Sequence, residues 1–274
     1  MSERTRTWAG AAVLFITPVV FLAGALAHPF VADYTHTIVV ADAVRAAPGQ
    51  WAVAHLLLAI GLGLMPLAVL VIRDEFRRAE EERWSAIGVP LLIVGATLVA
   101  TIVGTEITLA AVVDSGGDVL AVREADEALT LPLFLVGVLL FVLGWLSFAM
   151  AFYRARILPT ALNWWAIVAL VALAIAFFIP QTWGTYTYGL AILMVSWLVG
   201  YRMVARARWL LARMRGDRRE SRPRLGHRRA VLVGPPGWWR TAEVIDARRS
   251  TVPPGRPGSL RPRSRPDSRR RACS

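Results

Sequence analysis

The chain has 274 residues, 56% of them hydrophobic, and a formal net charge of +12 to which lysine contributes nothing. All 31 basic residues are arginine, which excludes a Walker-A phosphate loop and Schiff-base catalysis, since both need a lysine. The only cysteine, Cys273, excludes an intrachain disulfide. Gly61 and Gly63 lie in an apolar stretch without the third glycine of a dinucleotide loop, so we predict that they are small residues at a helix–helix contact.

Six apolar stretches dominate the sequence, and each approaches or exceeds the roughly 20 residues that a helix needs to cross a bilayer core about 30 Å thick. They predict an all-α polytopic membrane protein with six transmembrane helices. The predicted spans cover residues 8–27, 51–72, 86–113, 131–153, 161–179 and 183–204, within a transmembrane domain of residues 1–204.

The arginine content of the connecting segments alternates along the chain. Arginines precede the first span, follow the second and fourth, and dominate after the sixth, whereas Arg45 and Arg123 are the only ones after the first and third spans. Because arginines near span ends stay in the cytoplasm, this pattern predicts that both termini are cytoplasmic (N-in/C-in). Trp51 is then expected in an outer aromatic belt.

The first span has a second interpretation. Its basic stub, apolar run and small residues Ala25-Leu26-Ala27 resemble a secretory signal peptide with a cleavage site. Cleavage would remove residues 1–27 and leave five spans with the same sidedness.

The C-terminal part carries nearly all of the positive charge. Residues 202–274 contain 21 arginines and 5 acids, which gives +16, whereas residues 1–201 contain 10 arginines and 14 acids, which gives −4. We predict a basic juxtamembrane helix over residues 205–215 and a disordered basic cytoplasmic tail over residues 216–274. A second interpretation of the tail, as an arm that binds nucleic acid, is less favoured because aromatic residues are sparse there. A third interpretation is that the distal tail is not a native reading frame. A lipid-facing basic cluster is expected to attract anionic lipids of the inner leaflet and comprises Arg202, Arg206, Arg208, Arg213 and Arg215.

Ionisable residues inside a span are costly and are therefore candidates for function. His55 lies in the second span and Glu106 in the third, and both are expected in the outer leaflet, where a contact between them is geometrically feasible. His28, at the end of the first span, completes a candidate intramembrane polar site. The alternative is a structural role, in which Glu106 is satisfied by neighbouring threonine hydroxyls or by His55.

Three functions are compatible with these features. The first is a non-enzymatic structural or accessory subunit with a membrane-protein partner and no cofactor, favoured because the common catalytic motifs are absent. The second is a small transporter or proton-coupled permease that uses Glu106 and His55. The third is a redox subunit that binds haem or quinone near His28 and His55, although a bis-histidine haem needs two histidines at similar depth on facing helices.

The junction of the fourth and fifth spans carries a family resemblance. Leu133–Gly137 and Gly144–Leu146 lie in an apolar helix that ends in the basic turn Arg154-Ala155-Arg156-Ile157-Leu158-Pro159, after which another helix is expected. The pattern is similar to small actinobacterial multi-pass membrane proteins of unknown function, and this resemblance implies no catalytic residues. Absent lysine and a single asparagine, Asn163, also indicate a GC-rich genome, so the predicted location is the bacterial inner (cytoplasmic) membrane.

Overall fold

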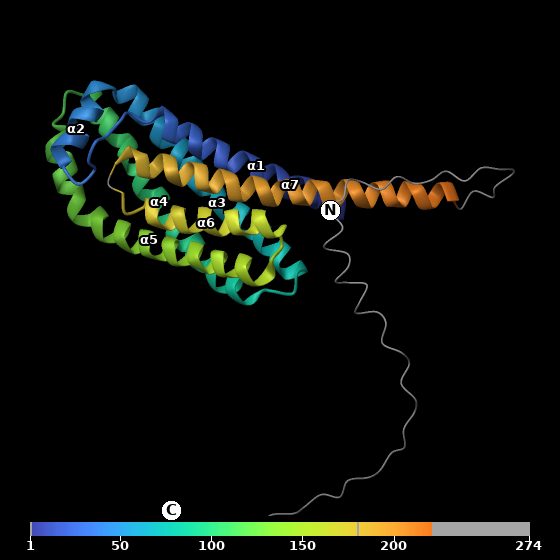
Figure 1. Ribbon diagram of the computed structural model, residues 1–274. Coiled ribbons are helices and arrows are strands. Elements are labelled where there is room, and N and C mark those ends of the chain that lie inside the picture. The colour runs from blue at the N-terminus through green and yellow to red at the C-terminus, as the bar shows by residue number, and fades with distance from the viewer. Residues whose placement is uncertain (1, 180, 221–274) are drawn as a thin grey trace, which may run out of the picture. The chain divides into compact units, whose positions relative to one another are not determined.

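The computed structural model describes residues 2–179 and 181–220, which are helical throughout apart from short connections and contain no strand (Figure 1). These residues belong to one compact unit, Met1–Ser221. Its elements are α1 (Glu3–Ala27), α2 (Thr37–Ala46), α3 (Pro48–Arg78), α4 (Arg83–Asp114), α5 (Val119–Ala155), α6 (Thr160–Ala176) and α7 (Thr182–Glu220). The described part is all-α, as predicted.

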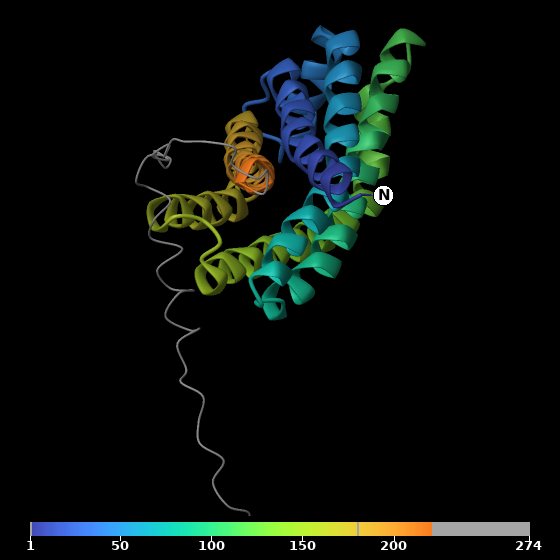
Figure 2. The ribbon, with the colours of Figure 1, turned by 90° about the vertical axis from the view of Figure 1, so that its right-hand side faces the viewer.

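The six longer helices form a closed ring. Each helix packs against the next, in the order α1, α3, α4, α5, α6 and α7, and α7 returns to pack against α1. Figure 2 shows α7 between α6 and α1, and the contacts agree. The interior of the ring is filled by large side chains that are at most 1% exposed, among them Phe76, Phe141, Trp145, Phe148 and Phe152. The ring is therefore a packed core.

Five helices of the described part are long and apolar enough to cross a membrane, namely α1, α3, α4, α5 and α7. This agrees with a polytopic membrane protein, and each of the five contains one predicted span. The exception is the predicted span 161–179, where α6 has only 17 residues and ends at Ala176. At 1.5 Å per residue α6 is about 25 Å long. Pro180 disfavours helical backbone at Ile179, which is the predicted end of the span.

Several helices extend past their predicted ends, because hydropathy detects the apolar part of a helix and misses polar turns. α5 begins at Val119, 12 residues before the predicted span, where the Asp118 side chain accepts hydrogen bonds from the backbone N–H of Leu120 and Ala121 at 3.0 and 3.4 Å. α7 continues past residue 215 to Glu220. Residues 221–274, to which most of the predicted disordered tail belongs, lie outside the described residues.

The segment between the first two predicted spans contains a helix that hydropathy did not indicate. α2 lies across one end of the bundle and packs against α3, α4 and α5 (Figure 1). Its buried residues Val40, Ala41 and Val44 form a small second core with Trp51 and other apolar side chains. Trp51 is only 1% exposed, so its expected place in an outer aromatic belt is wrong: α2 covers it.

Glycines set the closest approaches between helices. On α4, a Cβ at Gly95 would lie 2.8 Å from the Gly137 carbonyl oxygen of α5. On α3, a Cβ at Gly61 would lie 2.8 Å from Phe21 of α1, which confirms Gly61 as a contact residue. Among the described residues, no atom of another helix lies within 4 Å of the position that a Cβ at Gly63 would take, so the same prediction is wrong for Gly63. Direction on the helix decides this, because residues two apart point to different faces.

Candidate functional site

The two predicted site histidines meet at the end of the bundle that α2 covers. His28 follows the last residue of α1, and His55 lies in the second turn of α3. Their ring centroids are 4.8 Å apart, and the Trp51 ring lies 4.7 Å from His28 and 4.4 Å from His55. Both histidines are 5% exposed. The three rings therefore form one buried aromatic cluster that joins α1 to α3.

Each histidine has a backbone partner. His28 Nδ1 lies 2.6 Å from the carbonyl oxygen of Pro29, and His55 Nδ1 lies 2.9 Å from the carbonyl oxygen of Trp51. Because a carbonyl oxygen only accepts, Nδ1 carries the proton in both bonds. These bonds orient both rings and suit the structural alternative that the sequence left open.

Glu106 pairs with an arginine and not with His55. Its Oε1 accepts from Nη1 of Arg123, on α5, and the two side chains are 12% and 20% exposed respectively. The Trp51 indole N–H donates to the backbone oxygen of Glu106 at 3.0 Å. Trp51 thus lies between His55 and the α4 backbone, and the contact between His55 and Glu106 that the sequence allowed is replaced by separate partners.

The threonines near Glu106 do not satisfy its carboxylate. Thr105 and Thr108 donate to carbonyl oxygens of their own helix at 2.7 and 2.6 Å, the common arrangement for hydroxyls in apolar helices. The Oε2 atom of Glu106 is buried and finds no hydrogen-bond partner among the described residues. One oxygen of this carboxylate therefore remains open to a donor.

Sequence reasoning missed Arg123, which it placed in a loop. The structure puts Arg123 in the second turn of α5, where it crosses to α4. α4 ends at Asp114 and α5 begins at Val119, so Glu106 lies eight residues from the turn and Arg123 only four. The sequence offered one signal: Arg123 is the only basic residue between the third and fourth predicted spans, among five acids.

The connection between α1 and α2 is held against α7. The Thr182 hydroxyl accepts from the Val31 backbone N–H at 2.8 Å and donates to the Val31 carbonyl oxygen at 3.1 Å. Both residues are fully buried. In the same connection, burial lowers the pKa of His28, opposed by its hydrogen bond to the Pro29 carbonyl, and burial raises the pKa of Tyr34 to about 12. Both side chains are therefore neutral at pH 7.

The cluster does not fit a bis-histidine haem. The rings of His28 and His55 contact each other directly at 4.8 Å and leave no space between them for a macrocycle. Among residues 2–179 and 181–220, no group of three or more histidine, cysteine, aspartate and glutamate side chains is arranged to hold a metal ion. The arrangement instead provides a buried aromatic cluster next to one ion pair.

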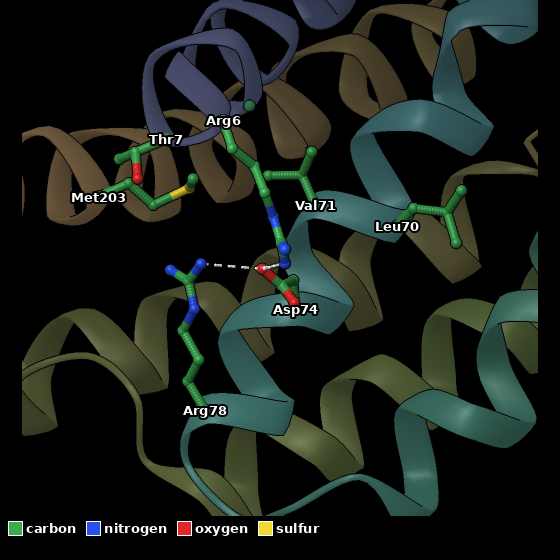
Figure 3. A pocket seen from close by; sticks show the side chains of 8 residues that line it. Arg6, Thr7, Leu70, Val71, Asp74, Arg78 and Met203 are labelled. Atoms are coloured by element: carbon green, nitrogen blue, oxygen red, sulfur yellow. Dashed lines mark hydrogen bonds and ion pairs between the residues drawn. The ribbon is translucent and has the colours of Figure 1, made fainter. Parts of the chain in front are cut away.

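The opposite end of the bundle carries most of the arginines. Asp74 of α3 accepts from Arg6 of α1 at 2.6 Å and pairs with Arg78, one turn further along α3, at 3.0 Å (Figure 3). Of the predicted lipid-facing cluster, Arg202 is half-buried and near enough to Glu75 of α3 for electrostatic attraction.

The remaining members of the predicted cluster lie further along α7. Arg206 and Arg208 are exposed, whereas the side chains of Arg213 and Arg215 fall outside the part that the structure describes. Whether this cluster binds lipid stays a prediction.

Comparisons with known proteins give no family for this chain: no protein-family model, no curated protein and no solved structure matches it. They lend no support to the resemblance to actinobacterial membrane proteins. The local arrangement expected from that pattern is nevertheless present, since α5 ends at Ala155 and α6 begins at Thr160.

Proposed function

We propose that this chain is a multi-pass protein of the bacterial inner membrane and serves as a non-enzymatic structural or accessory subunit of a membrane assembly. The observation that carries this proposal is the closed, filled helix ring. Trp145, Phe148 and Phe152 occupy its interior and are at most 1% exposed. Transport by alternating access needs a central site between helix repeats that rock or gate against each other, whereas such packing favours a rigid bundle.

The same proposal includes six crossings with both termini in the cytoplasm. The alternation of arginine-rich and arginine-poor connections supports it. A short helix such as α6 is accommodated by local thinning of the bilayer at modest cost. Retention of residues 1–27 is also favoured, because α1 packs between α3 and α7 and its removal would open the ring.

A partner helix would find an apolar surface on α5. Three leucine side chains between 45% and 58% exposed lie four residues apart on one face of this helix, namely Leu131, Leu135 and Leu139. In a bilayer this surface meets lipid tails or the apolar face of another membrane protein, and shape decides between them. An accessory subunit uses such a surface for assembly.

One observation favours the second candidate, a small proton-coupled permease. The unpartnered Oε2 of Glu106 could bind and release a proton, and intramembrane carboxylates often do so in transporters. The ion pair with Arg123 opposes this role, because a neighbouring cation favours the charged carboxylate. We therefore rank the permease second.

Liposomes that contain the full chain and a pH-sensitive dye separate the two candidates. A structural subunit gives no proton flux above empty liposomes, in the wild type and in Glu106→Gln alike. A permease gives a proton flux that Glu106→Gln abolishes and Glu124→Gln leaves intact. Glu124 is an exposed residue that follows Arg123 on α5, and it serves as the matched control.

The accessory role also predicts that the chain has a protein partner in the membrane. Cross-linking in native membranes, followed by extraction in mild detergent, should recover the chain in a stoichiometric complex with another membrane protein. Recovery of the chain alone, together with flux that depends on Glu106, would overturn the accessory role.

A further inference from the structure

We propose that the cleft between α1, α3 and α7 at the arginine-rich end binds the headgroup of an anionic phospholipid that carries a hydroxyl beside its phosphodiester. The inference rests on the membrane embedding proposed above and does not depend on the accessory role. It follows from a cavity, a buried carboxylate oxygen without a donor, and the local charge.

Two adjoining cavities form the cleft. One has a volume of about 210 Å³ and the other about 140 Å³, and both are lined by Thr7, Arg78 and Met203. Figure 3 shows the first, in which Arg6 and Arg78 approach Asp74 from two sides. The cleft therefore lies where α1, α3 and α7 come together.

Glu75 of α3 faces the second cavity and is incompletely satisfied. Its side chain is only 2% exposed. Oε1 accepts from Nη1 of Arg78 at 2.7 Å, but Oε2 is buried without a hydrogen-bond partner among the described residues. A buried carboxylate oxygen without a donor is costly, so a ligand that fills this cavity gains most by donating a hydrogen bond.

The charge around the cleft selects an anion. Arg4, in the first turn of α1, and Arg206, on α7, are both exposed and line the second cavity. The ionisable groups in and beside the cleft are five arginines and three acids, which gives a net +2: Arg4, Arg6, Arg78, Arg202 and Arg206 against Glu3, Asp74 and Glu75. Arginines bind phosphate oxygens well. A headgroup ammonium would meet repulsion here, so the donor for Glu75 is a hydroxyl.

The first cavity suits the start of an acyl chain. Gly10, Leu70, Val71 and Met203 give it a mainly apolar wall. A glycerophospholipid with its phosphodiester between Arg4 and Arg206 would place its headgroup hydroxyl at Glu75 and its apolar part along this wall. The shared chemistry, a phosphate beside a hydroxyl, also occurs in soluble glycerol phosphate, which the experiment must separate from the lipid.

Native mass spectrometry of the full chain tests the site with three lipids that have identical acyl chains. Phosphatidylglycerol offers the anionic phosphodiester and the hydroxyl, phosphatidylethanol keeps the charge and lacks the hydroxyl, and phosphatidylethanolamine adds an ammonium. We expect phosphatidylglycerol to be retained about tenfold better than phosphatidylethanol, the size expected for a hydrogen bond to a charged group. Equal retention of all three lipids would overturn the proposal.

Two variants assign the binding to these residues. Glu75→Ala should reduce the preference for phosphatidylglycerol over phosphatidylethanol to about one. Arg206→Ala should weaken both anionic lipids by the same factor, whereas Arg208→Ala, an exposed arginine on α7 outside the cleft lining, should change neither. A preference that survives Glu75→Ala, or equal effects of Arg206→Ala and Arg208→Ala, refutes the site.

Folding and the source of the ligand are controlled separately. If Glu75→Ala unfolds the protein, Arg206→Ala still tests the site, because Arg206 is exposed. Displacement of the lipid by millimolar glycerol phosphate or inorganic phosphate would identify a soluble ligand and overturn the lipid assignment. Resistance of the chain to alkaline extraction from membranes tests the embedding on its own, so a failure there is distinguishable from a failure of the site.

Discussion

α4 and α5 approach each other closely at Gly95, where an alanine should force the two helices apart. The added Cβ would lie 2.7 Å from the Phe141 backbone nitrogen and 2.8 Å from the Gly137 carbonyl oxygen. Ordinary van der Waals contacts of a Cβ begin at 3.4 Å, so the helices must separate by roughly 0.7 Å. Both contacted atoms are backbone, and no side-chain rotation relieves the overlap.

The magnitude follows from two opposing effects. Overpacking by one carbon costs about 1–3 kcal/mol, and contact with rigid backbone puts Gly95 in the upper part of that range. Alanine also favours the helical state over glycine by about 1 kcal/mol. We therefore expect Gly95→Ala to lower the free energy of unfolding by about 1–2 kcal/mol.

Gly104 provides the matched control on the same helix. Nothing lies within 4 Å of the position that its Cβ would take, so only the helix preference acts. Gly104→Ala should leave the free energy of unfolding unchanged or raise it by up to about 1 kcal/mol. Unfolding by sodium dodecyl sulfate in mixed micelles, followed by tryptophan fluorescence, measures both variants. If Gly95→Ala proves as stable as Gly104→Ala, the close backbone contact between α4 and α5 does not exist.

Three further predictions concern the end of the bundle that α2 covers. Glu106→Gln and Arg123→Met should each lower the free energy of unfolding by about 1–3 kcal/mol, because each change leaves a partly buried group unpaired. The double variant should lose less than the sum of the two single losses, and additive losses in the same titration would contradict the pairing. Thr182→Val should cost about 1–3 kcal/mol by leaving the Val31 N–H without its acceptor, whereas Thr182→Ser should retain most of the stability. Burial lowers the pKa of His28 in the folded protein below the value of 6.5 that it has in the unfolded chain, so its contribution to stability is complete above pH 6.5 and is lost as the pH falls toward the folded-state pKa. The free energy of unfolding should therefore be lower at pH 5 than at pH 7.5, and His28→Gln should reduce this difference.

Hydropathy was sufficient for the elements that it describes. A run of about 20 apolar residues has few stable alternatives to a membrane helix, and five such runs lie inside α1, α3, α4, α5 and α7. The sixth run is apolar as well, but α6 ends at Ala176, and the six-span topology stays a prediction. Hydropathy missed α2 and the first turns of α5, because their stability comes from packing on neighbouring elements and from a polar cap.

The partners of the polar side chains were beyond sequence reasoning. Trp51 was assigned to an interface by its position at a span end, yet α2 buries it. Glu106 was given a choice of partners on its own helix or on α3, yet Arg123 reached it from α5.

What the amino-acid sequence determined by itself is therefore local: which segments are apolar enough to be membrane helices, where the arginines gather, and that lysine-dependent chemistry is excluded. The tertiary structure alone decided that α7 returns to α1 and closes a filled ring, and that His28 and His55 contact Trp51. It also decided that Glu75 has one buried oxygen without a hydrogen-bond partner among the described residues, beside a basic cleft. The physical reason is that helix formation depends on neighbours within one or two turns, whereas the direction in which a side chain points acquires meaning only when distant helices pack against it.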